Sequence, residues 1–406
     1  MTSDPSAGVC LIRRVVIRNY KSIAACDVEL RPLTFLVGPN GSGKSNFLDA
    51  LRFVSDALQD SLGHAIRSRG GIAEIRRHSR DYPSHFGIRL EFDLPTGAHG
   101  HYAITIGGPT SLQNEECFIT GGVDTKSERH FFRVSQGIVQ ESTLALEPAV
   151  TPDRLFLVNA SGTPDFRPVY DALSGMGFYN LNPDIIRDLQ TPGFRGRLAR
   201  DGSNLVSVLQ QLEAAAPHLK SRIEEYLSQV VPGIHAVDPV PVGPRETLVF
   251  AQRLADGDRP FLASSMSDGT LRALAILVAL FQSGAEHEPA PSLVGLEEPE
   301  TALHPAATGV LIDSMRDATS VRQVLVTSHS PDLLDNPSIA DSEILAVNAD
   351  EGETRVGHLD EAGRSVLRDH LFTAGDLLRM NQLRPDPASR ALSPDDLELF
   401  GAGATA

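Results

Sequence analysis

The chain has 406 residues, enough for one large domain or two of ordinary size with a substantial buried core. Its formal net charge of −16 means that the surface as a whole repels nucleic acid and anionic membranes, so any DNA contact has to be local. The three scattered cysteines, Cys10, Cys26 and Cys117, argue against a disulfide framework and a zinc site, and suggest reduced thiols. No targeting segment is visible, and no apolar run approaches the ~20 residues that span a bilayer. We therefore expect a cytoplasmic protein without a membrane partner.

The N-terminal part predicts short strands, a glycine-rich loop and a helix. VVIRNY, ACDVEL and LTFLV have the composition of β-strands, and the third leads directly into the loop. Residues 46–62 then carry apolar side chains at the spacing of one buried helical stripe: Phe47, Leu48, Leu51, Val54 and Leu58. Further β-like runs between His85 and Val139, separated by turn residues, predict an antiparallel sheet that flanks the core.

The rest of the chain predicts a helical insertion followed by alternating helices and strands. Residues 204–211 and 218–230 have helical periodicity without a sustained heptad, so we expect a compact insertion and not a coiled-coil arm. Residues 265–344 then read as loop, helix, strand, helix, strand, loop and strand, which predicts a parallel sheet. The predicted class is α/β, with a mixed or parallel core sheet, an antiparallel β flank and a helical insertion. The expected boundaries are 1–165 and 233–383 for the core, 166–232 for the insertion and 384–406 for a flexible tail.

The glycine-rich loop matches the phosphate-binding pattern G-x-x-x-x-G-K-[ST] at every fixed position. Its residues are Gly38, Pro39, Asn40, Gly41, Ser42, Gly43, Lys44 and Ser45. Glycines let successive backbone N–H groups point at phosphates at the start of a helix. Lys44 would then reach the β- and γ-phosphates, and the Ser45 hydroxyl would bind Mg²⁺.

An acidic pair follows the apolar strand at residues 293–296. Glu297 would hold Mg²⁺ through its water shell, and Glu298 would orient and deprotonate the attacking water. Carboxylates at this position suit catalysis because α/β sheets bind ligands beyond the carboxyl ends of their strands. Taken alone, such a pair is more often a solvated strand end, and its meaning depends on the phosphate loop.

Two further polar loops complete the candidate site. His329 follows another buried strand, and one helix and one strand fit between it and Glu298, so the two strands can be neighbours and His329 can act as a γ-phosphate sensor. Ser267 and Gly269 begin a helix over residues 271–281. By themselves they form only an N-cap, but a Ser-x-Gly turn at a helix N-terminus is also a phosphate-binding device.

In this order, GPNGSGKSN, SDGTLRAL, LVGLEEPETALHP and TSHSP resemble the motifs of ABC-type ATPase heads of the SMC/RecF class. The chain looks most like the AAA-type ATPases grouped with overcoming-lysogenisation-defect (OLD) proteins. The resemblance runs from Ile17 to Pro331 and implies a P-loop ATPase of ABC/SMC type that uses ATP and Mg²⁺ and closes as a homodimer around the nucleotide.

The resemblance also assigns roles to individual residues. Ser267 and Gly269 would contact ATP bound to the other subunit, and residues 301–304 would cross the dimer interface. Lys21, Ser22 and Asn46 would join the nucleotide-binding set. The signature reads SDGT instead of the Ser-Gly-Gly-Gln of transporters, and the Mg²⁺ carboxylate is Glu297 instead of the commoner Asp. The family's Q-loop role has no candidate, because no glutamine lies between Gln59 and Gln113.

Two basic stretches offer a local DNA contact, although they can equally be solvated faces or arginines beside the nucleotide. They are Arg67, Arg69, Arg76, Arg77 and Arg80 with His64 and His78, and Arg187, Arg195, Arg197 and Arg200. The first candidates for weak, salt-sensitive DNA binding are Arg76 and Arg77.

The leading functional interpretation is an ATPase switch that acts on DNA or on a partner, which by analogy suggests DNA repair or anti-phage defence. The OLD-type nuclease domain is not evident, so a separate nuclease or effector protein is the expected partner. The alternative is a motor subunit of a transport complex. Many more residues separate Lys44 of the phosphate loop from Ser267 of the signature than separate these two motifs in transporter heads, which argues against this alternative. A GTPase or small-molecule kinase leaves the SDGT and TSHSP loops unexplained and lacks an Asn-Lys-x-Asp motif.

Overall fold

The computed structural model describes residues 9–77, 83–108, 111–121, 129–145, 148–151, 153–193, 196–255, 257–284 and 289–401. These residues form two compact units. Unit 1 comprises residues 177–339 together with Val9 and residues 373–376, and unit 2 comprises residues 10–176, 340–372 and 377–401. The units follow spatial contacts and differ from the four ranges expected from sequence, which stay a prediction of domain organisation.

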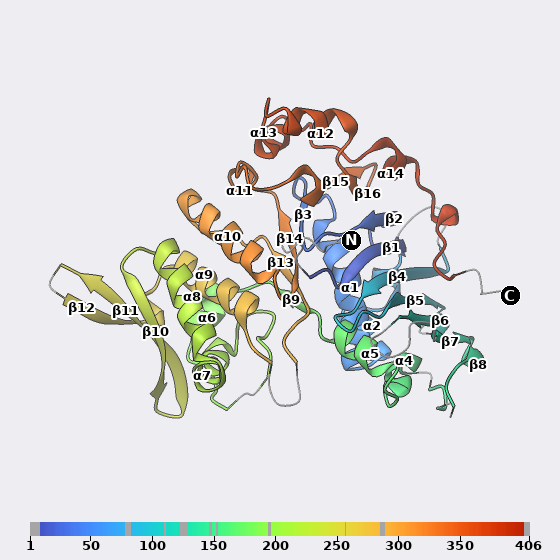
Figure 1. Ribbon diagram of the computed structural model, residues 1–406, viewed down its shortest axis with the longest axis horizontal. Coiled ribbons are helices and arrows are strands. Elements are labelled where there is room, and N and C mark those ends of the chain that lie inside the picture. Colours follow the sequence, from blue (N-terminus) through green and yellow to red (C-terminus); the bar gives the residue numbers. More distant parts are fainter. Residues whose placement is uncertain are drawn as a thin grey trace. The chain divides into compact units, whose positions relative to one another are not determined.

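Unit 2 is built on a mixed β-sheet with strand order β8-β7-β6-β5-β4-β1-β2-β16-β15-β3 (Figure 1). Neighbouring strands from β8 to β2 are antiparallel, whereas β16 runs parallel to β2 and β15 runs parallel to β3. The strands are β1 (Ile12–Tyr20), β2 (Ile23–Glu29), β3 (Leu33–Val37), β4 (His85–Asp93), β5 (His99–Gly107), β6 (Ser111–Thr120), β7 (Arg129–Ser135), β8 (Ile138–Ser142), β15 (Ile344–Asp350) and β16 (Glu353–His358).

The helix that follows the phosphate loop anchors that loop to the core of unit 2. All five apolar residues of its predicted stripe are buried, and Phe53 makes edge contacts with Tyr20 and Phe86 at ring-centroid distances of 6.1 and 5.4 Å. The unit's helices are α1 (Lys44–Gln59), α2 (Leu62–Arg67), α3 (Ile72–Ile75), α4 (Phe156–Ala160), α5 (Arg167–Ser174), α12 (Glu361–Arg368) and α14 (Pro387–Ala391), with 3₁₀ turns η3 (Asp341–Glu343) and η4 (Pro394–Asp396).

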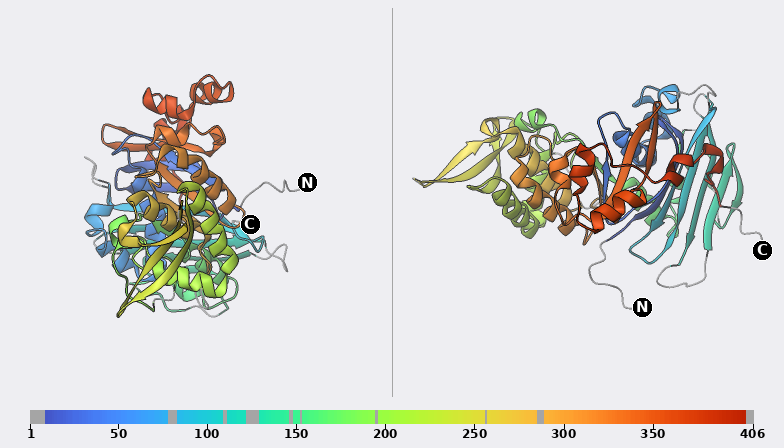
Figure 2. Two further views of the ribbon diagram at one scale, coloured as in Figure 1. Left: turned by 90° about the vertical axis from the view of Figure 1, so that its left-hand side faces the viewer. Right: turned by 90° about the horizontal axis from the view of Figure 1, so that it is seen from above.

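Unit 1 contains a parallel β-layer, a small antiparallel sheet and a set of helices. In the layer, β9 (Gly177–Tyr179) and β14 (Gln323–Ser328) flank β13 (Leu293–Glu297). The small sheet has the order β10-β11-β12 and projects beyond the helices of this unit in the right-hand view of Figure 2. Its strands are β10 (Ile234–Val242), β11 (Arg245–Leu254) and β12 (Gly257–Leu262).

One helix of unit 1, α9 (Asp268–Phe281), is buried on every side from Thr270 onward. A helix that is apolar all round has to lie inside the fold, and α8 and α10 pack against it. The other helices are α6 (Pro183–Arg187), α7 (Leu205–Ala215), α8 (Pro217–Val230), α10 (Thr308–Ala318) and α11 (Pro331–Leu334), with turns η1 (Ala263–Ser265) and η2 (Pro305–Ala307). Helix α13 (Ala374–Arg379) is divided between the units, since residues 374–376 are assigned to unit 1 and residues 377–379 to unit 2.

The predicted fold class and order of elements are confirmed. The three opening strands are β1 to β3, the antiparallel flank is β4 to β8, and the two helical segments of the insertion are α7 and α8. The predicted parallel pairing of the strands that carry the acids and the histidine is also present. Within the described ranges, no helix is both long and apolar enough to cross a bilayer.

The expectation of a flexible tail is wrong for residues 385–401. Leu397 and Leu399 are only 6% and 5% exposed and pack with Val16 and Ala25 on the sheet of unit 2. Leu399 fits there because the sheet has Gly87 beneath it, where a Cβ would lie 2.2 Å from the leucine Cδ1. The polar composition of this segment gave no sign of these two alternating leucines, which pack on the sheet. Residues 402–406 lie outside the described part of the chain.

A buried carboxyl group joins the antiparallel flank to the start of helix α4. Glu115 accepts hydrogen bonds from the backbone N–H groups of Phe156 and Leu157 at 2.6 and 2.8 Å, and from the hydroxyl of Tyr102 at 2.9 Å. Burial raises the pKa of Glu115 to about 7, and these three donors only partly oppose the shift. Its neighbour Glu116 behaves in the opposite way. Burial would raise the Glu116 pKa, but His101, Arg133 and the N–H of Gly401 outweigh burial and lower it.

This contrast predicts how stability depends on pH. Because the pKa is raised, the folded state retains a proton that the unfolded chain loses once the pH exceeds its glutamate pKa of ~4.3. The contribution of Glu115 to stability therefore falls as the pH rises to about 7. We expect the stability of Glu115→Gln relative to that of wild type to be roughly 2.5 kcal/mol higher at pH 8 than at pH 5. Urea unfolding at both pH values measures this difference.

The matched control is Glu116→Gln, which removes a carboxylate whose pKa is depressed. Its loss of stability should be nearly the same at pH 5 and pH 8, because the contribution of a carboxylate with a depressed pKa is already present above the unfolded pKa of ~4.3. If the two variants show the same pH dependence, the Glu115 assignment is contradicted.

Candidate nucleotide-binding site

The phosphate loop in unit 2 depends on glycine at two positions. Gly43 precedes helix α1 with a φ of 99°, and a Cβ there would lie 2.0 Å from Oγ1 of Thr354. A Cβ on Gly38 would lie 1.9 Å from the carbonyl oxygen of Val347. Any larger residue would therefore collide with β15 or β16. The loop is consequently held in one curled conformation against these two strands.

Lys44 lies folded into this curl. Its buried Nζ donates to the carbonyl oxygens of Gly38 and Pro39 at 2.9 and 3.0 Å. The hydroxyl of Ser42 is buried without a hydrogen-bond partner among the described residues, whereas Ser45 is exposed at the start of the helix. A lysine and a backbone curl at a helix N-terminus form a site for an anion. These residues therefore fit nucleotide phosphates.

A chain of hydrogen bonds connects the loop to β16. The amide of Asn46 donates to Oγ of Ser22 at 2.6 Å, Ser22 and Thr354 lie 2.7 Å apart, and Thr354 donates to the carbonyl of Ser42 at 2.9 Å. Because Thr354 uses its only proton on Ser42, Ser22 has to donate to Thr354. The structure thus brings together the predicted residues Ser22 and Asn46, and it adds Thr354. No motif identifies Thr354, which comes from a distant strand.

Lys21 lies in a charged cluster beside the loop. Its Nζ is 2.6 Å from a carboxylate oxygen of Asp49, which also contacts Arg52 and Arg69 at 2.7 and 3.0 Å. Burial would raise the pKa of Asp49, but Arg69, Arg52 and Lys21 outweigh burial and lower it to about 2. The cluster fixes the face of α1 that follows the phosphate loop. It also shows Lys21 in a structural ion pair, with a left-handed φ of 48°.

The acidic pair in unit 1 lies at the end of β13, as predicted. Oε1 of Glu297 accepts a hydrogen bond from Arg200 at 2.6 Å, and Glu298 has a left-handed φ of 46°. The N–H of Glu298 donates to the carbonyl of Thr327 at 3.0 Å. A non-glycine residue with this φ is uncommon and strained, and such residues often lie at functional sites.

His329 and Glu298 come from neighbouring parallel strands and meet at this edge. Nδ1 of His329 lies 3.0 Å from Oε1 of Glu298, although the angle does not make a hydrogen bond. More than a third of each side chain is exposed. The predicted proximity of these two residues is therefore present, and their catalytic roles stay a prediction.

The Ser267 turn begins the long buried helix α9. Oγ of Ser267 accepts from the N–H of Thr270 at 3.2 Å, and Arg187 forms an ion pair with Asp268. A Cβ on Gly269 would lie 2.5 Å from the carbonyl oxygen of Ala302. Residues 301–304 therefore pack against the turn, and Ser267 and Asp268 remain exposed.

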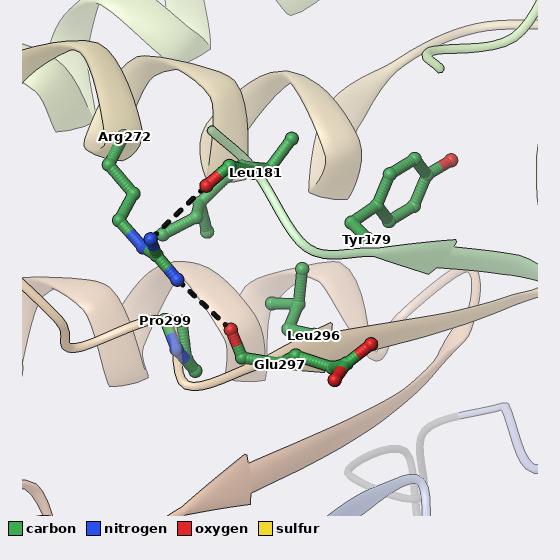
Figure 3. Close-up of a pocket in the computed structure, with 7 residues that line it drawn as sticks. Tyr179, Leu181, Arg272, Leu296, Glu297 and Pro299 are labelled. Carbon is green, nitrogen blue, oxygen red and sulfur yellow. Dashed lines mark hydrogen bonds between the residues drawn. The ribbon is translucent and has the colours of Figure 1, made fainter. Parts of the chain in front are cut away.

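An arginine of α9 connects this helix to the acidic pair (Figure 3). Arg272 donates to the carbonyl oxygens of Leu181, Glu297 and Glu298 at 3.1, 3.2 and 3.0 Å. It lines a small pocket with Tyr179, Leu181, Ile276, Leu296, Glu297 and Pro299. Arg272 belongs to the SDGTLRAL motif, but the motif did not predict a role for it. Its position five residues after Ser267, in an otherwise apolar helix, is the signal that could have identified it.

Most arginines of the two basic stretches are engaged within the protein. The side chain of Arg69 is only 2% exposed and pairs with Asp49. Arg69 is therefore a buried structural residue, which the sequence did not predict. Arg77 pairs with Glu353, and Arg76 donates to the carbonyl of Ser84. Three residues of these stretches lie outside the described part of the chain: His78, Arg80 and Arg195.

Comparisons with known proteins agree with this fold. Residues 33–98 and 128–335, more than half of the chain, match the model of a family described as "AAA domain, putative AbiEii toxin, Type IV TA system". Structural maintenance of chromosomes protein 1 of Schizosaccharomyces pombe is 27% identical over 179 residues, which cover 39% of this chain and 14% of that protein. DNA replication and repair protein RecF of Vibrio cholerae is 33% identical over 107 residues, covering 24% of this chain and 29% of RecF. The chain thus spans less than a third of each relative's length.

Solved structures add support for the fold. An SmcHead bound to the C-winged helix domain of ScpA has a TM-score of 0.55 at 13% identity and covers 86% of this chain and 97% of its own. A Pyrococcus furiosus Smc head, bound to the C-terminal domain of ScpA, has a TM-score of 0.51 at 13% identity and covers 89% of this chain and 100% of its own. The predicted ABC/SMC/RecF-type head is confirmed. These matches do not name the OLD proteins, so that closer resemblance stays a prediction.

The hydrogen-bond chain through Thr354 predicts a measurable effect on nucleotide binding. Thr354→Val keeps the shape of the side chain but removes the hydroxyl that bonds to Ser42 and Ser22. We expect about five- to tenfold weaker ATP binding, corresponding to the ~1 kcal/mol typical of one hydrogen bond. Titration with a fluorescent ATP analogue measures this affinity. Thr354→Ser restores the hydroxyl and should bind as wild type; equal weakening in both variants would contradict the role of the hydroxyl.

Proposed function

The chain belongs to this AAA-domain family and is also similar to SMC and RecF proteins, and we propose that it binds and hydrolyses ATP as a homodimeric switch. The observation that carries this proposal is the phosphate cradle around Lys44, with the lysine already folded into a glycine curl at the start of α1. The acidic pair, the histidine and the Ser267 turn support it from unit 1.

The residues of unit 2 hold the nucleotide. Lys44 binds the β- and γ-phosphates, and the N–H groups of residues 40–45 line the phosphates. Ser22, Asn46 and Thr354 keep the loop in its curled form. Lys21 supports α1 through Asp49 and lies beside the same loop.

The residues of unit 1 carry the hydrolytic step. The hydroxyl of Ser45 and the carboxylate of Glu297 would hold Mg²⁺ directly or through water, and the ion would supply charge to neutralise the phosphates. Within the described ranges no three His, Cys, Asp or Glu side chains are grouped so as to hold a metal, so such an ion depends on the phosphates as well. Glu298 orients the attacking water and takes its proton, and His329 contacts the γ-phosphate.

The exposed Ser267 turn supports closure between two copies. Its helix dipole and exposed N-terminal edge suit a γ-phosphate, and Gly269 keeps the turn close to residues 301–304. Each of the two sites would combine the phosphate loop of one chain with the Ser267 turn of the other. ATP would then join the two chains, and hydrolysis would release them.

DNA or a separate effector protein is the proposed target of the switch. RecF is named for DNA replication and repair, and a role in DNA repair or anti-phage defence follows by analogy. The acidic net charge limits DNA binding to a local surface, for which Arg67 is exposed, whereas Arg77 is mostly covered by its ion pair with Glu353. A nuclease partner and a cytoplasmic location belong to the same proposal.

The proposal predicts different defects from two substitutions. Lys44→Ala removes the charge that holds the phosphates and should abolish ATP binding. Glu298→Gln keeps the shape of the side chain but cannot accept a proton, so it should bind ATP normally and lose at least ~100-fold in kcat. Nucleotide titration and steady-state phosphate release separate the two effects. Wild-type affinity in Lys44→Ala, or wild-type turnover in Glu298→Gln, contradicts the assignment.

A further inference from the structure

Arg272 is a buried cation that makes no hydrogen bond to a carboxylate of the described residues. Its residue is 9% exposed, and burial lowers the pKa of the guanidinium despite the opposing charges of Glu300 and Glu298. Its Nε has no hydrogen-bond partner within the described residues. Burying a charge in this way is costly. The stabilisation that offsets this cost has to come from the three carbonyl oxygens to which its terminal nitrogens donate.

Two of those carbonyl oxygens belong to the acidic pair itself. Arg272 donates to the backbone of Glu297 and Glu298 at 3.2 and 3.0 Å, and to Leu181 after β9 at 3.1 Å. Figure 3 shows the guanidinium between the carbonyls of Leu181 and Glu297, with the Glu297 carboxylate pointing away from it. The arginine therefore fixes the backbone of the acids and leaves their side chains available.

The backbone that Arg272 holds is strained. Glu298 has its left-handed φ of 46°, and Ala302, further along the same loop, has a φ of 66°. Strained conformations persist only where surrounding contacts enforce them. Arg272 supplies contacts at one end of this loop, and the close approach of Gly269 to the carbonyl of Ala302 supplies one at the other. Both contacts come from the first turns of α9.

Helix α9 also carries the Ser267 turn. Ser267 is its N-cap, and Arg272 follows five residues later, about 7.5 Å along the axis of a rigid helix. Any shift of the turn is therefore transmitted directly to the carbonyl groups of Glu297 and Glu298, with no flexible segment between them.

We propose that Arg272 is a positioning residue that holds the Glu297–Glu298 backbone in its catalytic conformation and couples it to the Ser267 turn. This inference rests on the proposed ATPase function. When a partner's nucleotide engages the Ser267 turn, α9 sets the position of the water-activating Glu298. Hydrolysis is thereby restricted to the closed dimer. Arg272 touches neither the nucleotide nor the water and acts through the acids.

The test compares two buried arginines of unit 1. Arg272→Lys keeps the charge but cannot span three carbonyl groups. The matched control is Arg322→Lys: Arg322 is also buried, at 6% exposed, and donates to a backbone carbonyl, that of Gln282 at 3.1 Å, away from the acids. We expect Arg272→Lys to lower kcat about 10- to 100-fold while changing the KM for ATP less than about threefold. Arg322→Lys should change kcat less than about twofold. Arg272→Gln serves as a second variant if the lysine variant does not fold.

A double variant separates positioning from a general structural effect. If Arg272 acts through the acids, adding Arg272→Lys to Glu298→Gln should lower the residual turnover much less than Arg272→Lys lowers the kcat of wild type. Equal losses of kcat in Arg272→Lys and Arg322→Lys, or additive losses with Glu298→Gln, would overturn the proposal. Unchanged kcat in Arg272→Lys and Arg272→Gln, while Glu298→Gln abolishes turnover, overturns it and leaves the proposed function standing. Wild-type turnover in Glu298→Gln contradicts the proposed function itself.

Discussion

The phosphate loop depends on one close contact, the approach of Gly43 to Thr354. With no side chain at Gly43, the loop can pass against β16 and curl at the start of α1, and Thr354 then holds the curl by bonding to Ser42. The position of Lys44 follows from this curl, because its ammonium group is held by carbonyl oxygens of the same loop. The proposed ATP site therefore depends on a contact between Gly43 and Thr354, which lie far apart in the sequence.

The sequence predicted the local parts of this arrangement well. Spacing alone located the phosphate loop, the buried stripe of α1 and the two parallel strands that bring Glu298 and His329 together. These features depend on periodicity and short motifs, which a single sequence displays. Nothing in the sequence pointed to Thr354, because its contact with the loop is created by the pairing of distant strands.

The arginines were the least predictable part of the site. In a chain with a net charge of −16, clustered arginines suggested a DNA surface, but several arginines bind other groups of the protein. Arg69 fixes Asp49, Arg200 binds the Glu297 carboxylate, and Arg272 holds the backbone of the acids. Each has partners far away in the sequence, so clustering alone could not show which arginines face solvent. The prediction of a flexible tail failed for a similar reason, since Leu397 and Leu399 pack on strands that are distant in the sequence.

The central claim is that each ATP site is completed by two chains, and mixing two inactive variants tests it most directly. Lys44→Ala lacks a working phosphate loop but keeps its Ser267 turn, whereas Ser267→Arg binds ATP but blocks closure against the partner's nucleotide. After subunit exchange, each heterodimer contains one site in which both residues are intact. ATP hydrolysis measured across mixing ratios at constant total protein should peak near equal proportions. Substantial hydrolysis by Ser267→Arg alone, at concentrations where wild type is dimeric, would show that no turn from a second chain is needed.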